Sequence, residues 1–283
     1  MKQRIITALV LAPLAISAIF FLPLKFFMLF AAGLFLLASK EWAGFVSKVP
    51  SLLTVGLFCL FLGATIVLMP VDAIWQAGLV NGYISSGLAV ASMWWCVALA
   101  LVVGYPRSAT QWKSNKLIKS IFGLLTLVPF FWGLVALRSV NIGHDFYFGA
   151  ELVMYVFLLV WAADTGAYFA GKSFGKHKLA PKVSPGKTIE GLVGGLLSAL
   201  LVAYCASLFF AISDEKLVVF FAASIITTLV SALGDLTESI FKREAGLKDS
   251  GNLLPGHGGI LDRIDSLTAA IPVFALIYIY WLI

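Results

Sequence analysis

The sequence predicts an all-α polytopic membrane protein with about nine transmembrane helices. Three observations support this fold class: the composition, the length of the apolar runs and the placement of positive charge. Of the 283 residues, 61% are hydrophobic and 12% are charged, whereas globular proteins carry about 25% charged residues. The mean hydropathy is +0.99. This composition excludes an ordinary soluble fold.

The apolar residues are gathered into runs that are long enough to cross a bilayer. A spanning helix needs about 20 consecutive, mostly apolar residues. Such runs predict spans at roughly 5–22, 25–46, 51–70, 84–103, 118–137, 151–171, 190–212, 216–235 and 264–283. In the seventh span, Gly191, Gly194 and Gly195 are spaced as in helices that approach a neighbour closely.

The distribution of Lys and Arg predicts the orientation of the spans, because cytoplasmic loops carry an excess of both. With the N-terminus in the cytoplasm, only three of the 20 Lys and Arg residues fall on the other side, namely Lys25, Arg138 and Lys216. The first run follows Lys2 and Arg4, as a secretory signal would. It is long, lacks a clear cleavage site and leads directly into further spans, so we expect it to remain as the first span.

The chain divides into a scaffold and a region that carries the chemistry. Residues 1–137 form five apolar runs with few polar groups. Glu41 stands near the end of a run, where a long side chain reaches the membrane surface at little cost. Residues 138–283 contain the remaining spans and two polar loops that we expect in the cytoplasm, 172–189 and 236–263.

Net charge and cysteine content narrow the classes of partner. The net charge of +6 mainly reflects topology. It favours contact with anionic membrane lipids and gives no argument for nucleic acid. Cys59, Cys96 and Cys205 all lie inside apolar runs without metal-ligand spacing, so we interpret them as packing residues.

One polar segment, 239–265, stands out from its apolar surroundings. It reads SIFKREAGLKDSGNLLPGHGGILDRID and combines basic, acidic and glycine residues. Carboxylates hold hard cations such as Mg²⁺, and Lys and Arg neutralise phosphate oxygens. Glycines let backbone N–H groups approach an anion. The segment is therefore suited to phosphate chemistry, although a solvated basic loop has a similar composition.

Helical spacing brings the acidic residues of this region onto common faces. Asp262 and Asp265 are three residues apart, and Asp235 precedes Ser239 and Lys242 at intervals of four and seven. Two helix ends joined by a glycine-rich loop would direct these carboxylates toward one metal ion.

A second polar stretch lies in the loop 172–189. Its Gly-Lys-Thr resembles part of a phosphate-binding P-loop, but Pro181 stands where that motif needs glycine and no strand precedes it. We expect Ser184 to cap a helix whose N-terminus, beside Lys187 and Thr188, attracts anions. A basic loop with a capped helix is the alternative. Inside the preceding span, Asp164 is a carboxylate at membrane depth, which predicts a functional role.

Residues 239–265 resemble the signature of the phosphatidate cytidylyltransferases, also called CDP-diacylglycerol synthases. Ser239, the Lys242-Arg243 and Lys248-Asp249 pairs, the His-Gly-Gly at 257–259 and the Asp-Arg-x-Asp at 262–265 all stand at the spacing of that signature. The shorter stretch SPGKTIEG, 184–191, is similar to a second polar block that this family associates with the nucleotide.

The resemblance implies a reaction between CTP and phosphatidate that yields CDP-diacylglycerol and pyrophosphate. It also implies Mg²⁺ as cofactor, a helical membrane bundle, a homodimer, and a bacterial-type cytoplasmic (inner) membrane with the site facing the cytoplasm. A CTP-dependent lipid kinase and a secondary transporter are the alternatives. The kinase would transfer the γ-phosphoryl group and release CDP.

The expected site residues fall into three groups. Metal ligands are expected at Asp235, Asp262 and Asp265, which also count as catalytic. Lys248, a phosphate ligand, and His257, beside the leaving group, complete the catalytic set. Residues expected to bind nucleotide or substrate are Ser184, Lys187, Thr188, Glu190, Ser239, Lys242, Arg243, Arg263 and Asp164.

Overall fold

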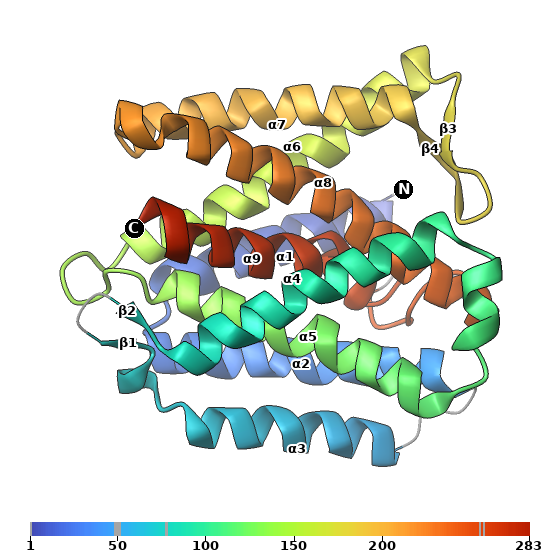
Figure 1. The fold of residues 1–283 in the computed structure, drawn as a ribbon, viewed down its shortest axis with the longest axis horizontal. Helices are drawn as coiled ribbons and strands as arrows, with labels where there is room; N and C mark the ends of the chain where they lie inside the picture. Colours follow the sequence, from blue (N-terminus) through green and yellow to red (C-terminus); the bar gives the residue numbers. More distant parts are fainter. Residues whose placement is uncertain (1, 48–51, 77–78, 255, 257) are drawn as a thin grey trace.

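The computed structural model describes every residue except 1, 48–51, 77–78, 255 and 257. Within this part the chain forms nine α-helices (Figure 1). Their bounds are α1 Lys2–Phe21, α2 Leu24–Val46, α3 Leu52–Leu68, α4 Gly82–Val103, α5 Lys116–Arg138, α6 Phe148–Phe174, α7 Ile189–Phe209, α8 Asp214–Ala245 and α9 Leu261–Ile277. A π-helical turn, Tyr278–Leu282, continues α9.

Each predicted span overlaps one of these helices. Among the described residues, seven helices are long and apolar enough to cross a membrane: α2, α4 to α8, and α9 with its π-helical extension. The helices α1 and α3 contribute shorter apolar segments, Leu9–Phe21 and Leu52–Leu68. The prediction of an all-α polytopic membrane protein is confirmed. The cytoplasmic position of the N-terminus stays a prediction.

The helices α5 and α9 form the centre of the bundle (Figure 1). They are the two most deeply buried of the seven spans. They pack closely because Gly133 on α5 lies against α9, where an added Cβ atom would stand 3.0 Å from the Ile271 side chain. The outer helix α3 lies at one side of this core, and the α6–α7 pair lies at the other.

Small residues hold α6 and α7 together, as the sequence predicts. A Cβ atom added at Gly195 would stand 2.7 Å from the Ala163 carbonyl oxygen, and one added at Gly194 would overlap Ala170. Gly166 on α6 likewise lies against α7 at Ser198. This close packing fixes the C-terminal half of α6, with Asp164, beside the start of α7.

Two short antiparallel hairpins connect the helices. β1 (Trp75–Gln76) pairs with β2 (Leu79–Val80), and β3 (Lys178–Ala180) pairs with β4 (Ser184–Thr188). The expectation that Ser184 caps a helix is wrong, because Ser184 pairs with Ala180 in the sheet. The cap of α7 is Thr188, whose hydroxyl accepts a hydrogen bond from the Gly191 N–H at 3.1 Å.

The helix α8 continues past 235, where the sequence predicts the end of the span. It ends at Gly246, whose φ of 70° suits a left-handed C-cap. The extension is stabilised by the i, i+4 pair of Glu238 and Lys242. Asp235, Ser239 and Lys242 therefore lie on one continuous helix, as their spacing predicts.

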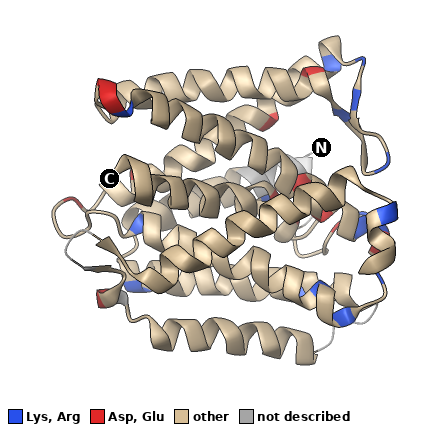
Figure 2. Ribbon diagram, viewed as in Figure 1, with Lys and Arg blue, Asp and Glu red and all other residues tan. Residues whose placement is uncertain are grey.

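The charged residues of the chain gather mainly at one end of the bundle. Figure 2 shows most Lys and Arg residues at the end that carries β3 and β4. The two helices that contain the acidic positions, α8 and α9, pack against each other along their length. This packing brings Asp235 of α8 close to Asp265 of α9.

Candidate active site

The site is built around an ion pair between the β3–β4 hairpin and α8. Lys187 Nζ lies 2.7 Å from Asp235 Oδ2. One turn further along α8, the Ser239 hydroxyl donates to Asp235 Oδ1 at 3.3 Å. The side chains of Lys187 and Asp235 remain 27% and 31% exposed, so a ligand can reach both. A phosphate would compete for Lys187, and a cation would compete for Asp235.

A cavity of about 290 Å³ opens beside this ion pair, between α6, α7 and α8. Its lining includes Asp164, Lys187, Thr188 and Asp235. Asp164 is close enough to interact electrostatically with both members of the pair. The cavity also adjoins the first turn of α7, and a helix N-terminus favours anions. Cationic and acidic groups thus meet in one cavity, as a metal–phosphate ligand requires.

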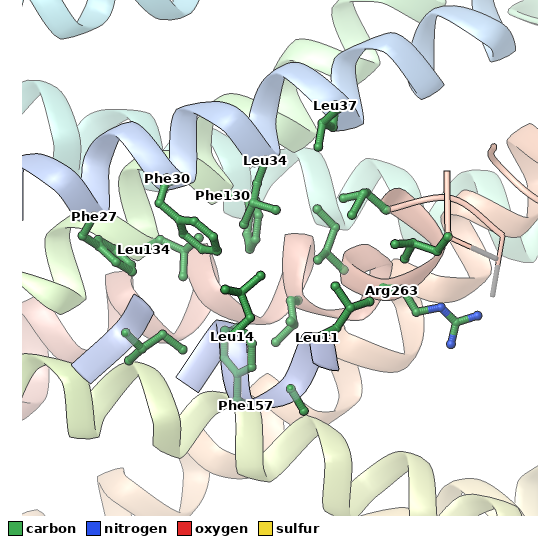
Figure 3. Close-up of a pocket in the computed structure, with 18 of the residues that line it drawn as sticks. Leu11, Leu14, Phe27, Phe30, Leu34, Leu37, Phe130, Leu134, Phe157 and Arg263 are labelled. Carbon is green, nitrogen blue, oxygen red and sulfur yellow. The ribbon is translucent and has the colours of Figure 1, made fainter. Parts of the chain in front are cut away.

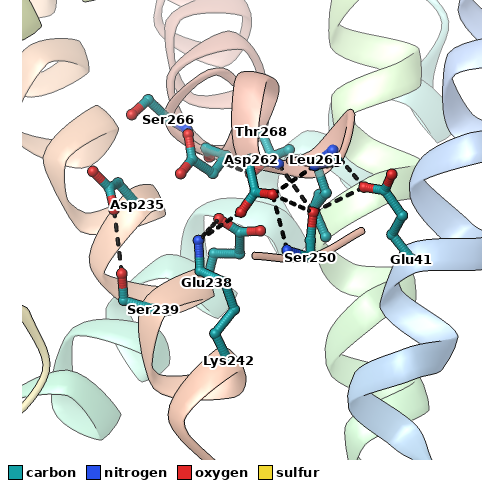
Figure 4. Close-up of polar contacts among 12 residues, drawn as sticks. Glu41, Asp235, Glu238, Ser239, Lys242, Ser250, Leu261, Asp262, Ser266 and Thr268 are labelled. Carbon is teal, nitrogen blue, oxygen red and sulfur yellow. Dashed lines mark hydrogen bonds and ion pairs between the residues drawn. The ribbon is translucent and has the colours of Figure 1, made fainter. Parts of the chain in front are cut away.

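A second polar cluster joins α8 to the start of α9 (Figure 4). Lys242 Nζ lies 2.9 Å from Glu238 Oε2 and 2.8 Å from Asp262 Oδ1. Asp262 Oδ2 accepts hydrogen bonds from the Ser250 N–H, the Ser250 hydroxyl and the Gly259 N–H at 2.8 to 2.9 Å. Both oxygens of Asp262 are therefore engaged by protein donors that fold the signature loop onto α9.

The third acidic group, Asp265, lies between the two clusters. It is close enough to interact electrostatically with both Asp235 and Glu238. In the described part of the chain, no N–H group or hydroxyl donates to the buried Glu238 Oε1, and the neighbouring Asp265 can hydrogen bond to Glu238 only when one of the two carboxyl groups is protonated. Neighbouring carboxyl groups without a donor between them need a shared proton or a cation. This arrangement fits a hard cation such as Mg²⁺ near Asp265 and Asp235.

The structure does not gather the three expected metal ligands onto one ion. Asp235 and Asp265 are neighbours, whereas Asp262 points to Lys242 and the loop. Across the described residues, no group of three His, Cys, Asp or Glu side chains is placed to hold a metal ion. Asp262 would have to exchange its protein donors to become a ligand, and the three-carboxylate metal site stays a prediction.

Sequence reasoning missed Glu41, which caps α9 from the opposite end of the chain. Its carboxylate accepts hydrogen bonds from the Ile260 N–H at 2.9 Å and the Leu261 N–H at 2.7 Å. The Ser250 hydroxyl also donates to it at 2.9 Å. These backbone groups lack partners within α9, since the first N–H groups of a helix have none. A carboxylate at this point also complements the helix dipole.

The expectation that Glu41 reaches the membrane surface is wrong, because its side chain is only 9% exposed. Glu41 could have been identified by the argument applied to Asp164, because an acidic residue in an apolar run is costly and needs partners. Since Glu41 is near the end of its run, the sequence analysis assigned its carboxylate to the membrane surface instead.

Two glycines of the signature leave room for these carboxylates. A Cβ atom added at Gly259 would stand 2.3 Å from Glu41 Oε2, and one at Gly258 would stand 2.6 Å from Asp262 Oδ2. Gly258 also has a φ of 81°, which residues with a side chain rarely adopt. Because Gly258 and Gly259 have no side chains, the carboxylates of Asp262 and Glu41 can approach the loop and accept its hydrogen bonds.

The remaining predicted residues lie outside the cavity lining. Glu190 accepts hydrogen bonds from the His177 N–H at 3.2 Å, and its Oε1 lies 2.6 Å from His177 Nδ1. Arg243 Nε donates to the Val183 carbonyl oxygen at 3.4 Å, which ties α8 to the hairpin. Both side chains thus hold the hairpin in place.

The predicted site residues also include Lys248, His257 and Arg263. Lys248 is exposed in the loop after α8. His257 lies outside the described residues. Arg263 is exposed on the first turn of α9 and lines a different, apolar cavity. Their roles as ligands stay predictions.

Comparison with known proteins finds a matching family and several relatives. The model of the cytidylyltransferase family matches residues 2–281. The chain is 43% identical to a phosphatidate cytidylyltransferase of Haemophilus influenzae, covering 99% of both chains. It is 43% identical to the phosphatidate cytidylyltransferase of Pseudomonas aeruginosa over 97% of this chain and 96% of the relative. A Staphylococcus haemolyticus relative with the same name is 39% identical over 64% of this chain and 77% of its own length.

Proposed function

Because the chain belongs to the cytidylyltransferase family, we propose that it transfers the cytidylyl group of CTP to phosphatidate. The products are CDP-diacylglycerol and pyrophosphate. The observation that carries the proposal is the cavity in which Lys187 and the N-terminus of α7 face Asp235 and Asp164. Full-length relatives named for this activity support the choice of substrates.

The chemistry needs no nucleophile from the protein. A phosphate oxygen of phosphatidate attacks the α-phosphorus of CTP, the bond from that phosphorus to the bridging oxygen breaks, and pyrophosphate leaves. Catalysis then depends on holding the groups in line and neutralising their charge. In this proposal, Lys187 and Thr188, which line the cavity at the start of α7, hold the nucleotide phosphates. Ser239 orients Asp235 through its hydrogen bond.

Asp235 and Asp265 would hold Mg²⁺, which supplies charge neutralisation on the phosphate oxygens when it is bound. Support comes from the proximity of these two carboxyl groups and from the buried Glu238 oxygen to which no N–H group or hydroxyl of the described residues donates. Lys242 neutralises Glu238 and Asp262 at the edge of this site. It thereby limits the negative charge that an incoming triphosphate meets.

The proposal includes a bacterial cytoplasmic membrane, with the site open to the cytoplasm. The clustering of Lys and Arg at the end with the β3–β4 hairpin supports this orientation. A membrane-impermeant thiol reagent should label Lys182→Cys in inverted vesicles and not in intact cells, after the three native cysteines are replaced. Labelling in intact cells would contradict the orientation. The proposal also includes a homodimer, and native mass spectrometry of the purified protein tests it.

The activity is tested with purified protein in mixed micelles. Pyrophosphate release should require CTP, phosphatidate and Mg²⁺ together. Release of CDP in place of pyrophosphate would indicate the lipid-kinase alternative, and CTP turnover that ignores phosphatidate would contradict the proposal. Neither the kinase nor the transporter is favoured by the relatives, which carry the name of the cytidylyltransferase.

A further inference from the structure

A large apolar cavity lies against one face of α9 (Figure 3). Its volume is about 580 Å³, within the range of about 300–1,000 Å³ typical of ligand sites. The helices α1, α2, α5, α6 and α9 all contribute to its wall. Its lining is aliphatic and aromatic almost throughout, and includes Leu14, Phe30, Leu34, Phe130 and Phe157.

One cationic group, Arg263, lies at an end of this cavity (Figure 3). Ile264 and Leu267 from the same helix face the cavity with it. Successive helical residues are separated by about 100° around the axis, since a turn holds 3.6 residues. The helix α9 therefore presents Arg263 to the apolar cavity and Asp265 to the acidic side.

The chemistry of the lining selects one class of occupant. An apolar wall offers no hydrogen bonds to a nucleotide, and a guanidinium at its end complements a phosphate, which it binds in bidentate fashion. A second apolar cavity, between α6 and α7, contains Glu151 and no Lys or Arg in its described lining. That cavity would repel an anionic headgroup, and it provides an internal comparison.

We propose that the α1–α2–α9 cavity binds one acyl chain of the phosphatidate substrate, with the lipid phosphate at Arg263. This inference rests on the proposed function and adds the route of the lipid: it reaches the site past the N-terminal helices. Arg263 is on the first turn of α9, so a phosphate held by its guanidinium stands at the N-terminal end of the helix, where the apolar face and the acidic face meet. The nucleotide approaches from the α6–α7–α8 side, so the two substrates meet at this end of α9.

The first test fills the cavity. Ala15→Phe on α1 and Ala31→Phe on α2 place a ring in the proposed chain site. The KM for dioleoyl phosphatidate should rise severalfold, while the KM for CTP stays unchanged and dihexanoyl phosphatidate is affected much less. The matched control is Ala206→Phe in the α6–α7 cavity, which should leave all three values unchanged. Equal effects of the three variants, or equal effects on long and short chains, would overturn the proposal.

The second test avoids folding defects, because it uses the wild-type protein. A phosphatidate with a diazirine at the end of its acyl chain is photolysed in mixed micelles, and the labelled peptides are sequenced. Labelling should fall on α1, α2 and α5 and be removed by excess dioleoyl phosphatidate. Labelling confined to α4, the β3–β4 hairpin or α7 would overturn the assignment.

The third test concerns the headgroup. Arg263→Gln should raise the KM for phosphatidate more than that for CTP, and Arg263→Lys should restore part of the loss. A rise confined to the KM for CTP would refute the role of Arg263. These outcomes are separable from failure of the proposed function: if the wild type forms no CDP-diacylglycerol, the activity is wrong, whereas the photolabelling still reports whether the cavity binds the lipid.

Discussion

The Ser250 hydroxyl donates a hydrogen bond to Glu41 Oε2 at 2.9 Å, although the two residues are 209 positions apart in the chain. The same hydroxyl oxygen lies 2.9 Å from Asp262 Oδ2, so the α2 and α9 carboxylates share its single proton. The N-terminal region of the bundle therefore holds the signature loop in place. This link makes the geometry of the site depend on α2, a helix that carries no predicted site residue.

Replacing Glu41 should destabilise the loop and reduce activity. In Glu41→Ala, the Ile260 and Leu261 N–H groups lose their acceptor, and each buried unsatisfied group costs about 1–3 kcal/mol. Thermal unfolding in detergent and the initial rate of pyrophosphate release should both fall. Lys40→Gln, at the exposed neighbouring position, is the control and should leave both unchanged. A fully active, equally stable Glu41→Ala variant would show that the cap has no role.

Gly259→Ala should disrupt the same contact from the other side. The added methyl group would stand 2.3 Å from Glu41 Oε2, so the carboxylate must move away from its donors. Because the two residues share one contact, the double variant Glu41→Ala, Gly259→Ala should be less destabilised than the sum of the single variants. Gly44→Ala, where the Cβ atom meets nothing within 4 Å, is the control. Additive unfolding temperatures would speak against the contact.

Lys242→Met should lower the free energy of unfolding by about 3–5 kcal/mol, the range for removing one partner of a buried ion pair. Glu238, which is 3% exposed, and Asp262 would then be left without their cation. Chemical denaturation monitored by tryptophan fluorescence measures the change. The double variant Lys242→Met, Glu238→Gln should recover part of the loss, and no recovery would argue against this pairing.

Lys187→Met should raise the KM for CTP severalfold without lowering the unfolding temperature. The side chain is partly exposed, so its ion pair with Asp235 contributes at most about 1 kcal/mol to stability. Lys182→Met on the same hairpin is exposed and serves as the matched control. An unchanged KM for CTP in Lys187→Met would show that the nucleotide does not bind at Lys187.

The three carboxylates should separate into two classes. Asp235→Asn and Asp265→Asn should raise the Mg²⁺ concentration needed for half-maximal activity, because these groups are placed near a cation. Asp262→Asn should mainly lower the unfolding temperature, since Asp262 holds the Ser250 and Gly259 N–H groups. An Asp262 variant with normal stability and a raised Mg²⁺ requirement would restore the three-ligand site expected from the sequence.

The sequence analysis predicts the helices well because hydropathy alone identifies segments that must cross a bilayer. The apolar span predicted to end at 235 is only part of α8, because charged residues mark the end of an apolar run and not necessarily the end of the helix. Here Glu238 and Lys242 neutralise each other within the helix. It assigns a helix cap to Ser184 because Ser followed by Pro is common at helix starts. The pairing of Ser184 with Ala180 across the hairpin outweighs that local preference.

The site was predictable only in part. Asp235, Lys187 and Asp164 are all predicted site residues, and they lie together at one cavity because glycines allow α6 and α7 to pack closely. The contact of Glu41 with the loop depends on tertiary packing between chain segments that sequence spacing cannot relate. The same holds for the ion pair of Lys242 with Asp262, and the phosphate role of Lys242 stays a prediction.

The most direct measurement follows the two ends of the CTP triphosphate. Purified protein is incubated with phosphatidate, CTP labelled either at the α- or at the γ-phosphorus, and the Mg²⁺ concentration that gives half-maximal activity in the wild type, with folded Asp235→Asn as the low-activity reference. We expect α-label in the lipid, γ-label in pyrophosphate, and much less of both products from the variant at this Mg²⁺ concentration. Label from the γ-phosphorus in the lipid, or full transfer by Asp235→Asn, would contradict this expectation.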